Sequence, residues 1–213
     1  MTPERARKLS VEEQTDGVLE VVGVEGAEAE IAIWNPDGSR AELSGNGTRI
    51  AARWLAGETG AAEVRIRVGE RVTIARIDGD FVDQELGRVE VGAAERIDEV
   101  EFVPVSVGNP HAVVEGDPAE IARIGRLLER HPRFPNRTNV QVARRDGPRR
   151  VAARIWERGV GETSSSGTSA VAVAAALCGE GETEVSFPGG TVQVRIENGQ
   201  AFVRGPAERV GHP

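Results

Sequence analysis

The stretch WNPDGSRAELSGNGTRIAARWLAGE, residues 34–58, is the most informative part of the sequence, because a second copy of its pattern stands later in the chain. The second copy is WERGVGETSSSGTSAVAVAAALCGE, residues 156–180. In both copies a tryptophan stands ten positions before a serine, at Ser44 and Ser166, and a glycine follows that serine. The two copies therefore predict the same local structure.

Each Ser-Gly pair opens an alanine-rich pattern with helical periodicity. We predict helices over 47–56 and 168–177, with glycines suited to a left-handed cap at their ends, Gly57 and Gly179. Taken alone, a serine before a helix is most often an N-cap and nothing more. Because the pattern occurs twice, we favour a functional role for Ser44 and Ser166 in addition to capping.

The match continues through alternating strand patterns at 62–82 and 183–203, with tight hairpin turns predicted at 78–79 and 198–199. The two serines lie 122 positions apart, and the two turn glycines lie 120 apart. Two copies are too few for a solenoid. The sequence therefore predicts two homologous lobes related by a pseudo-twofold axis.

Between the copies, residues 100–117 predict two strands around a Gly-Asn-Pro turn, followed by a helix that begins at Asp117 and Pro118. The charged segment 93–100 separates strand patterns, so we place the lobes at 1–97 and 98–213. We expect the α/β class, with strands that wrap a helix in each lobe. The last residues are expected to return to the first lobe.

Composition excludes several classes of function. The chain has 213 residues and a net charge of −8, and its 26 basic residues are scattered, so nucleic acid is not an expected partner. No apolar run approaches the roughly 18 residues of a membrane span, and the N-terminus lacks the apolar core of a secretion signal, so we expect a cytoplasmic protein with no membrane partner. The single cysteine, Cys178, allows neither a disulfide framework nor a thiolate metal cluster within one chain, and no metal site is predicted.

The paired loops predict a site for an anion. A glycine-rich turn that enters a helix offers backbone N–H groups and the positive end of the helix dipole. The loops supply such groups at Gly45, Asn46, Gly167 and Thr168. If both helices bind one carboxylate, Ser44 and Ser166 lie on opposite faces of the adjacent carbon, a geometry that suits stereochemical inversion by proton transfer.

Four motifs, NPDGSRAELSGNGTR, VGNPHAVV, RFPNRTNVQ and ERGVGETSSSGTSA, resemble in order and spacing those of the diaminopimelate epimerases. The resemblance covers nearly all of the chain. It implies two pseudo-symmetric lobes, each a mixed β-sheet wrapped around a central helix, and an isomerase of lysine biosynthesis that needs no cofactor such as pyridoxal phosphate. In that family one cysteine from each lobe acts as base or acid at the α-carbon and so interconverts the LL and meso isomers of 2,6-diaminopimelate. The two cysteines fall on Ser44 and Ser166.

The resemblance also assigns the remaining positions of a site for a small amino-acid substrate. Gly45, Asn46, Gly167 and Thr168 match the clamp on the reacting carboxylate, and Glu157 matches the group that meets the distal ammonium. His111 and Glu157 match groups that adjust the acid and base, although a turn histidine is the alternative for His111. The residues that match the binding of the far end of the substrate are Asn35, Asn109, Asn139 and Arg158.

Two departures from the family pattern bear on activity. A serine hydroxyl lacks the near-neutral pKa that lets a thiol act as acid and base, so we expect recognition of a diaminopimelate-like amino acid with turnover in question. The alternatives are a hydroxyproline dehydratase- or epimerase-like lyase and a non-catalytic amino-acid-binding paralogue. The first family strand is expected to be missing, and the edges exposed by missing strands favour association as a homodimer.

Overall fold

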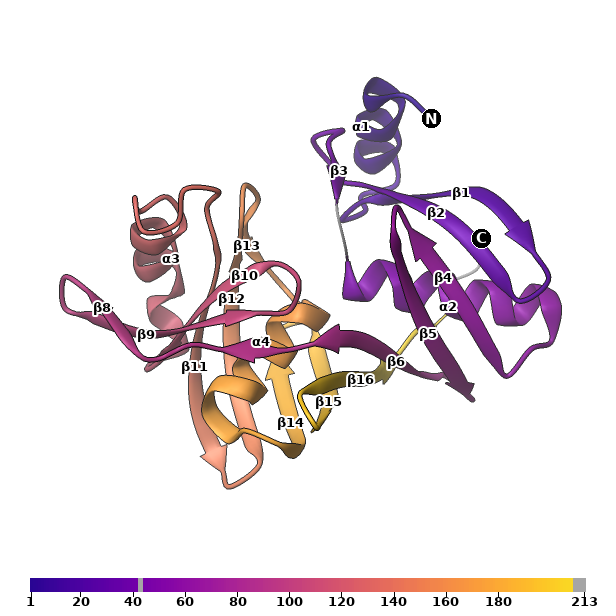
Figure 1. The fold of residues 1–213 in the computed structure, drawn as a ribbon. Helices are drawn as coiled ribbons and strands as arrows, with labels where there is room; N and C mark the ends of the chain where they lie inside the picture. Colours follow the sequence, from indigo (N-terminus) through magenta and orange to yellow (C-terminus); the bar gives the residue numbers. More distant parts are fainter. Residues whose placement is uncertain (42–43, 209–213) are drawn as a thin grey trace. The chain divides into compact units, whose positions relative to one another are not determined.

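The structure is a computed structural model that describes residues 1–41 and 44–208. The chain divides into two units, and each is considered by itself (Figure 1). Unit 1 consists of Met1–Gln84 with residues 206–208, and unit 2 of Glu85–Gly205. Residues 85–97, which the sequence analysis assigned to the first lobe, belong to unit 2. The lobe boundary at 97/98 stays a prediction.

Unit 1 is a mixed sheet with the strand order β1-β2-β4-β5-β6, and β3 pairs with β2. The β2–β4 pair is parallel, and the other pairs are antiparallel. The sheet packs on one long helix, α2 (Gly45–Thr59), which buries Ala52 and Leu55 against Ile66. The strands are β1 (Val18–Glu25), β2 (Glu28–Trp34), β3 (Arg40–Ala41), β4 (Glu63–Val68), β5 (Arg71–Asp78) and β6 (Phe81–Arg88), of which β6 continues into unit 2.

The return of the chain to unit 1 is visible at Ala207. Its backbone N–H donates to the carbonyl of Asp80 at 2.9 Å, and its side chain joins the core around α2. The remaining residues of the predicted return, 209–213, lie outside the described part of the chain.

Unit 2 has the strand order β16-β15-β14-β12-β11-β10-β9-β7, with β13 paired to β12 and β8 to β9. The β10–β11 and β12–β14 pairs are parallel, so this sheet is mixed as well. The strands are β7 (Glu90–Val91), β8 (Glu95–Ile97), β9 (Val100–Ser106), β10 (Pro110–Glu115), β11 (Asn139–Gly147), β12 (Arg150–Glu157), β13 (Gly161–Thr163), β14 (Gly181–Phe187), β15 (Gly190–Glu197) and β16 (Gln200–Pro206).

The central helix of unit 2 is α4 (Gly167–Cys178), and the sheet strands surround it (Figure 1). Nearly all of its residues are buried, as the uninterrupted run of small and apolar side chains requires. A second helix, α3 (Ile121–Glu129), follows the short 3-10 turn η1 (Pro118–Glu120). Each unit is therefore a mixed sheet around a central helix, and the predicted fold class is confirmed.

One of the two predicted helix-ending glycines and one of the two predicted hairpin turns lie where the sequence places them. Gly179 caps α4 at the predicted position, but with φ = +68° and ψ = −153° it does not adopt the predicted left-handed conformation. The turn at 198–199 has positive φ at both residues. The end of α2 differs from the prediction: the helix continues through Gly57 and is capped at Gly60, with φ = +72° and an N–H bond to Ala56 O of 2.8 Å. The β5–β6 turn also shifts by one residue, to 79–80, because residues 78 and 81 pair.

Helix α1 (Pro3–Glu12) was not predicted from the sequence. Thr2 caps it, since its Oγ1 accepts from Arg5 N at 3.3 Å, and Pro3 occupies the first helical position. The Thr-Pro pair is therefore a signal that was available in the sequence. In the part of the chain that the structure describes, no helix combines the length and apolar character needed to cross a membrane.

Candidate active site

Ser44 is the N-cap of α2. Its Oγ accepts a hydrogen bond from Gly47 N at 3.0 Å, and its carbonyl accepts from Thr48 N at 2.9 Å. Gly47 is closely surrounded, since a methyl group on its α-carbon would lie 3.2 Å from Leu19 Cδ2 and 3.4 Å from Ile33 Cδ1. The hydroxyl at this position therefore has a structural use as an N-cap.

The carbonyl of Gly45, the first residue of α2, is held by a buried glutamine of β6. Gln84 Nε2 donates to Gly45 O at 2.6 Å, while Gln84 Oε1 accepts from Thr48 Oγ1 at 2.8 Å. Gln84 and Thr48 are fully buried. The start of α2 is thereby fixed to the sheet, and the orientation of its first-turn N–H groups is fixed with it. Gln84 was not among the predicted site residues.

A buried cation lies beside the same helix start. Arg49 is 7% exposed, and its Nη2 donates to Asn46 Oδ1 at 2.9 Å, while Nε donates to Pro206 O at 3.3 Å. Burial lowers the pKa of Arg49 to about 10, so the guanidinium is still charged at neutral pH. Its charge adds to the positive end of the helix dipole, which favours an anion at this place. Arg49 was not among the predicted site residues. Its position near the start of a predicted helix, where the dipole disfavours a cation, was the signal that could have identified it.

Asn35 lies in the turn between β2 and β3. Its Nδ2 donates to Ser39 Oγ at 3.0 Å, and its carbonyl accepts from Gly38 N at 2.9 Å. These contacts are those of a turn-forming asparagine. A role of Asn35 in binding stays a prediction.

Ser166 caps α4 as Ser44 caps α2. Its Oγ lies 3.4 Å from Ser169 N and 3.4 Å from Thr168 Oγ1, so both bonds are longer than the cap bond of Ser44. Thr168 and Ser169 are buried, and Gly167 is the first residue of the helix. The two serines of the duplicated motif therefore have the same local role.

A chain of buried polar groups links His111 to the first turn of α4. Gln141 Nε2 lies 3.0 Å from His111 Nδ1 and 3.0 Å from Ser169 Oγ, and His111 Nε2 lies 2.9 Å from Asn109 Oδ1. His111 is 1% exposed, and burial, with a smaller contribution from the charge of Arg158, lowers its pKa to about 3. The imidazole is therefore neutral at physiological pH, and both of its nitrogens are engaged. Gln141 and Ser169 were not among the residues predicted from the sequence.

The hairpin between β12 and β13 carries Glu157 and Arg158. Asn139 Oδ1 accepts from Arg158 N at 3.0 Å, and Asn139 Nδ2 donates to Pro110 O at 3.0 Å. Glu157 Oε1 accepts from Thr163 Oγ1 at 2.7 Å. The residues predicted to bind the far end of the substrate thus include a cation, Arg158, and an anion, Glu157, which are adjacent in the chain. The amide of Asn139 is hydrogen-bonded to the backbone of Arg158.

These groups gather at one end of the unit 2 sheet. The parallel strands β10 and β11 begin there, with His111 opposite Asn139, and the antiparallel strand β12 ends there. Gln141 joins this end to the N-terminus of α4. The predicted site residues that unit 2 brings together are Asn109, His111, Asn139, Glu157, Arg158, Ser166, Gly167 and Thr168. The others, Asn35, Ser44, Gly45 and Asn46, belong to unit 1.

Within residues 1–41 and 44–208, no group of three or more histidine, cysteine, aspartate or glutamate side chains is placed to hold a metal ion. At the end of the unit 2 sheet, the available groups are the N-terminus of α4, amides, hydroxyls, the neutral imidazole of His111, the carboxylate of Glu157 and the guanidinium of Arg158.

Comparison with known proteins decides the family. The family described as Diaminopimelate epimerase matches residues 103–210. A diaminopimelate epimerase from Xanthomonas axonopodis pv. citri (strain 306) is 38% identical over an alignment 218 residues long. The alignment covers 89% of this chain and 77% of the relative. The chain belongs to the diaminopimelate epimerase family. Its membership places it among the isomerases.

Solved structures of the diaminopimelate epimerase-like fold agree with this assignment at the level of the fold. A predicted epimerase from Pseudomonas aeruginosa superposes with a TM-score of 0.73 at 15% identity, covering 97% of this chain and 88% of the other. A hydroxyproline epimerase from Agrobacterium vitis, with bound trans-4-hydroxy-L-proline, gives a TM-score of 0.67 at 16% identity, covering 91% and 72%. At these identities the similarity concerns the fold alone.

Proposed function

We propose that this chain binds a diaminopimelate-like amino acid as a cofactor-independent epimerase-type protein, acting on the LL and meso isomers of a lysine precursor. The observation that carries the proposal is the group at one end of the unit 2 sheet. There Glu157 and Arg158 lie on one hairpin, next to Asn139, and the N-terminus of α4 is joined to the same end through Gln141. A substrate with a carboxylate and an ammonium at both ends finds complementary groups in this set.

A helix N-terminus is proposed to bind the reacting carboxylate. The first N–H groups of a helix lack intrahelical acceptors and lie at the positive end of the dipole. Gly167 and Thr168 supply such a terminus in unit 2, and Gly45 and Asn46 supply the equivalent one in unit 1. Arg49 strengthens the attraction for an anion at α2.

The far end of the substrate is assigned to the hairpin. A guanidinium binds a carboxylate bidentately, and a carboxylate neutralises an ammonium, so Arg158 and Glu157 match the two distal groups. Asn139 and Asn109 are amides, which can donate to one group and accept from the other. A ring amino acid such as hydroxyproline lacks both distal groups, and this favours a diaminopimelate-like substrate over it.

Turnover by this chain is proposed to be slow, because the groups at both acid/base positions are hydroxyls used as helix caps. Ser44 Oγ is held by Gly47 N, and Ser166 Oγ lies near Ser169 N. A serine acts as a base only when another group takes its proton. His111 is neutral, and Asn109 and Gln141 engage both of its ring nitrogens. The binding frame is therefore retained while proton transfer is weakened.

The test is exchange of the α-hydrogen with deuterated solvent, followed by NMR with LL- and meso-diaminopimelate. We expect little exchange with the wild-type chain. The double variant Ser44→Cys, Ser166→Cys should exchange faster by about 10²- to 10⁴-fold, the usual contribution of a positioned acid or base. Single cysteine variants serve as controls, since a two-base inversion needs both thiols.

A parallel measurement of binding separates the alternatives. Thermal shifts with diaminopimelate and with trans-4-hydroxy-L-proline distinguish the two substrate classes. Stabilisation by hydroxyproline alone would favour the lyase alternative. Binding of diaminopimelate with no exchange in the double cysteine variant would favour a non-catalytic binding protein. A folded double variant that neither binds nor exchanges diaminopimelate would rule out the proposed function.

A further inference from the structure

The turn between β12 and β13 has two successive backbone N–H groups held by side chains from elsewhere in unit 2. Asn139 Oδ1 accepts from Arg158 N at 3.0 Å, and Glu129 Oε1 accepts from Gly159 N at 2.8 Å. The turn closes through a bond from Val160 N to Glu157 O of 3.1 Å. Gly159 has φ = +81°, which is the conformation that the third position of a type II turn requires. The turn is therefore positioned from outside the hairpin as well as from within it.

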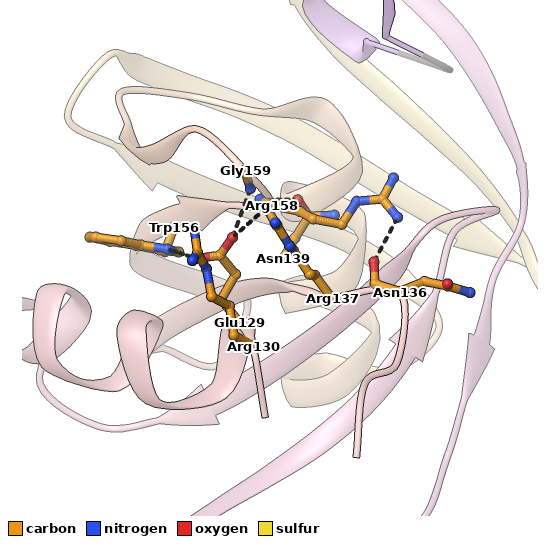
Figure 2. A network of polar contacts seen from close by, with 8 residues as sticks. All are labelled: Glu129, Arg130, Asn136, Arg137, Asn139, Trp156, Arg158 and Gly159. Atoms are coloured by element: carbon orange, nitrogen blue, oxygen red, sulfur yellow. Dashed lines mark hydrogen bonds and ion pairs between the residues drawn. The ribbon is translucent and has the colours of Figure 1, made fainter. Parts of the chain in front are cut away.

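Glu129 is the less expected of the two acceptors, because it is a carboxylate that is 5% exposed. Its Oε2 accepts from Trp156 Nε1 at 3.0 Å, and its Oε1 accepts from Gly159 N (Figure 2). The contacts of this one carboxylate thus bracket Glu157 and Arg158, one contact on each side along the chain. The Glu129 carboxylate therefore holds the chain both before and after the two charged residues at the hairpin tip.

The charge of Glu129 is balanced by two arginines at the surface. Arg137 Nη1 lies 3.7 Å from Oε1, and Arg130 Nε lies 3.8 Å from Oε2. Burial raises the pKa of Glu129, but the hydrogen bonds from Trp156 and Gly159 and the two arginine charges outweigh it, so the net shift is downward. The carboxylate is therefore ionised at neutral pH and accepts hydrogen bonds on both oxygens.

The backbone of Glu129 is itself fixed. Glu129 is the last residue of α3, whose buried stripe includes Ile121, Ile124 and Leu128. Its carbonyl accepts from Thr138 N at 3.2 Å, immediately before Asn139. The helix, the strand start that carries Asn139 and the hairpin tip are therefore joined around one carboxylate.

We propose that Glu129 is a positioning residue that sets the orientation of Glu157 and Arg158 through Trp156 and Gly159. Its part in recognition of the far end of the substrate rests on the proposed function. Glu129 itself contacts no substrate in this proposal. It acts by holding the hairpin that carries the two charged groups, and its loss should affect the binding of distal groups more than the binding of the amino-acid head.

The first test measures the hairpin without a ligand. Glu129→Gln keeps the shape of the side chain but turns one acceptor into an NH₂ group that faces an N–H donor. Amide hydrogen exchange by NMR on the ¹⁵N-labelled chain should show Gly159 N–H exchanging at least about tenfold faster than in the wild type. The amides of β15 should stay unchanged. Glu95→Gln is the matched control, because the Glu95 carboxylate accepts hydrogen bonds from Arg133, with Nε at 2.7 Å, and has no hydrogen bond to the hairpin among the described residues.

The second test measures recognition. Affinities for meso-diaminopimelate and for L-norleucine are compared, since norleucine has the same head and no distal charge. Glu129→Gln should weaken diaminopimelate binding about tenfold and leave norleucine binding within twofold. Glu95→Gln should change neither affinity. If Glu129→Gln does not fold, Trp156→Phe replaces it, because it removes one of the two hydrogen bonds that hold the carboxylate and keeps an aromatic ring in place.

The outcomes separate the two proposals. Gly159 exchange within twofold of the wild-type rate, in a folded variant, would overturn the positioning role. Equal weakening of diaminopimelate and norleucine would overturn it too, because a general loss of structure would then explain the result. If the wild-type chain does not bind diaminopimelate, the proposed function fails, while the exchange of Gly159 still decides whether Glu129 holds the hairpin.

Discussion

Gly125 of α3 lies directly against the side chain of Trp156 of β12. A methyl group on the α-carbon of Gly125 would stand 2.5 Å from Trp156 Cγ and 2.7 Å from its Cβ, which is closer than real carbon atoms approach. The indole N–H of Trp156 meanwhile donates to Glu129, one turn further along the same helix. The absence of a side chain at Gly125 therefore allows α3 to approach the strand that leads to the candidate site.

Gly125→Ala should destabilise the chain although alanine is the better helix former. Overpacking costs about 1–3 kcal/mol, and replacing glycine by alanine in a helix gains about 1 kcal/mol. A contact as close as this one should cost an amount near the upper end of the overpacking range, so the net effect is destabilising. Urea unfolding measures the difference. Gly57→Ala is the control, because Gly57 lies inside α2 with open space around its α-carbon. That variant should gain about 0.5–1 kcal/mol, and an equal effect of the same sign at both glycines would contradict this account.

The two capping serines should differ in their contribution to stability. Ser44→Ala removes a cap bond of 3.0 Å and should cost about 1 kcal/mol, whereas Ser44→Gly should cost only a few tenths. Ser166→Ala should cost less than Ser44→Ala, because the equivalent bond is 3.4 Å long. Denaturant midpoints of the three variants test the order. A larger loss at Ser166 than at Ser44 would show that cap geometry does not set these energies.

Acid should destabilise the chain through His111 before its carboxylates titrate. In the unfolded chain the imidazole takes up a proton near pH 6.5, while the folded chain, with a pKa of about 3, does not. The unfolded state therefore binds more protons, and stability is full above pH 6.5 and is lost as the pH falls toward 3. Between pH 7.5 and 5 the expected loss in unfolding free energy is about 2 kcal/mol.

The measurement is urea unfolding at several pH values for the wild type and for His111→Asn. The variant should lack this pH-dependent loss, whatever its stability at neutral pH. His131→Asn, at a partly exposed histidine, is the matched control and should retain it. A wild-type chain whose stability does not change between pH 7.5 and 5 would show that His111 is more accessible to protons than its burial indicates.

Helix ends marked by a single local signal were predicted well from the sequence. A helix end at which two residues offer the same signal was not. The serine caps of α2 and α4 and the position of the cap at Gly179 were predicted, since they depend on a few adjacent residues. The end of α2 was misplaced because two glycines, at 57 and 60, offered the same signal. Among the described residues, none lies within 4 Å of a methyl group added to Gly57, and the left-handed conformation falls on Gly60.

The sequence by itself determined the duplication, the two capped helices and the membership of the family, because periodicity, capping and motif spacing act over short distances along the chain. The tertiary structure alone decided which buried polar groups meet. Gln84 reaches Gly45 across 39 positions, and Gly159 reaches Glu129 across 30. Such pairs depend on strand register and on the approach of α3 to β12, so the groups that orient the candidate site become visible only when the sheet is formed.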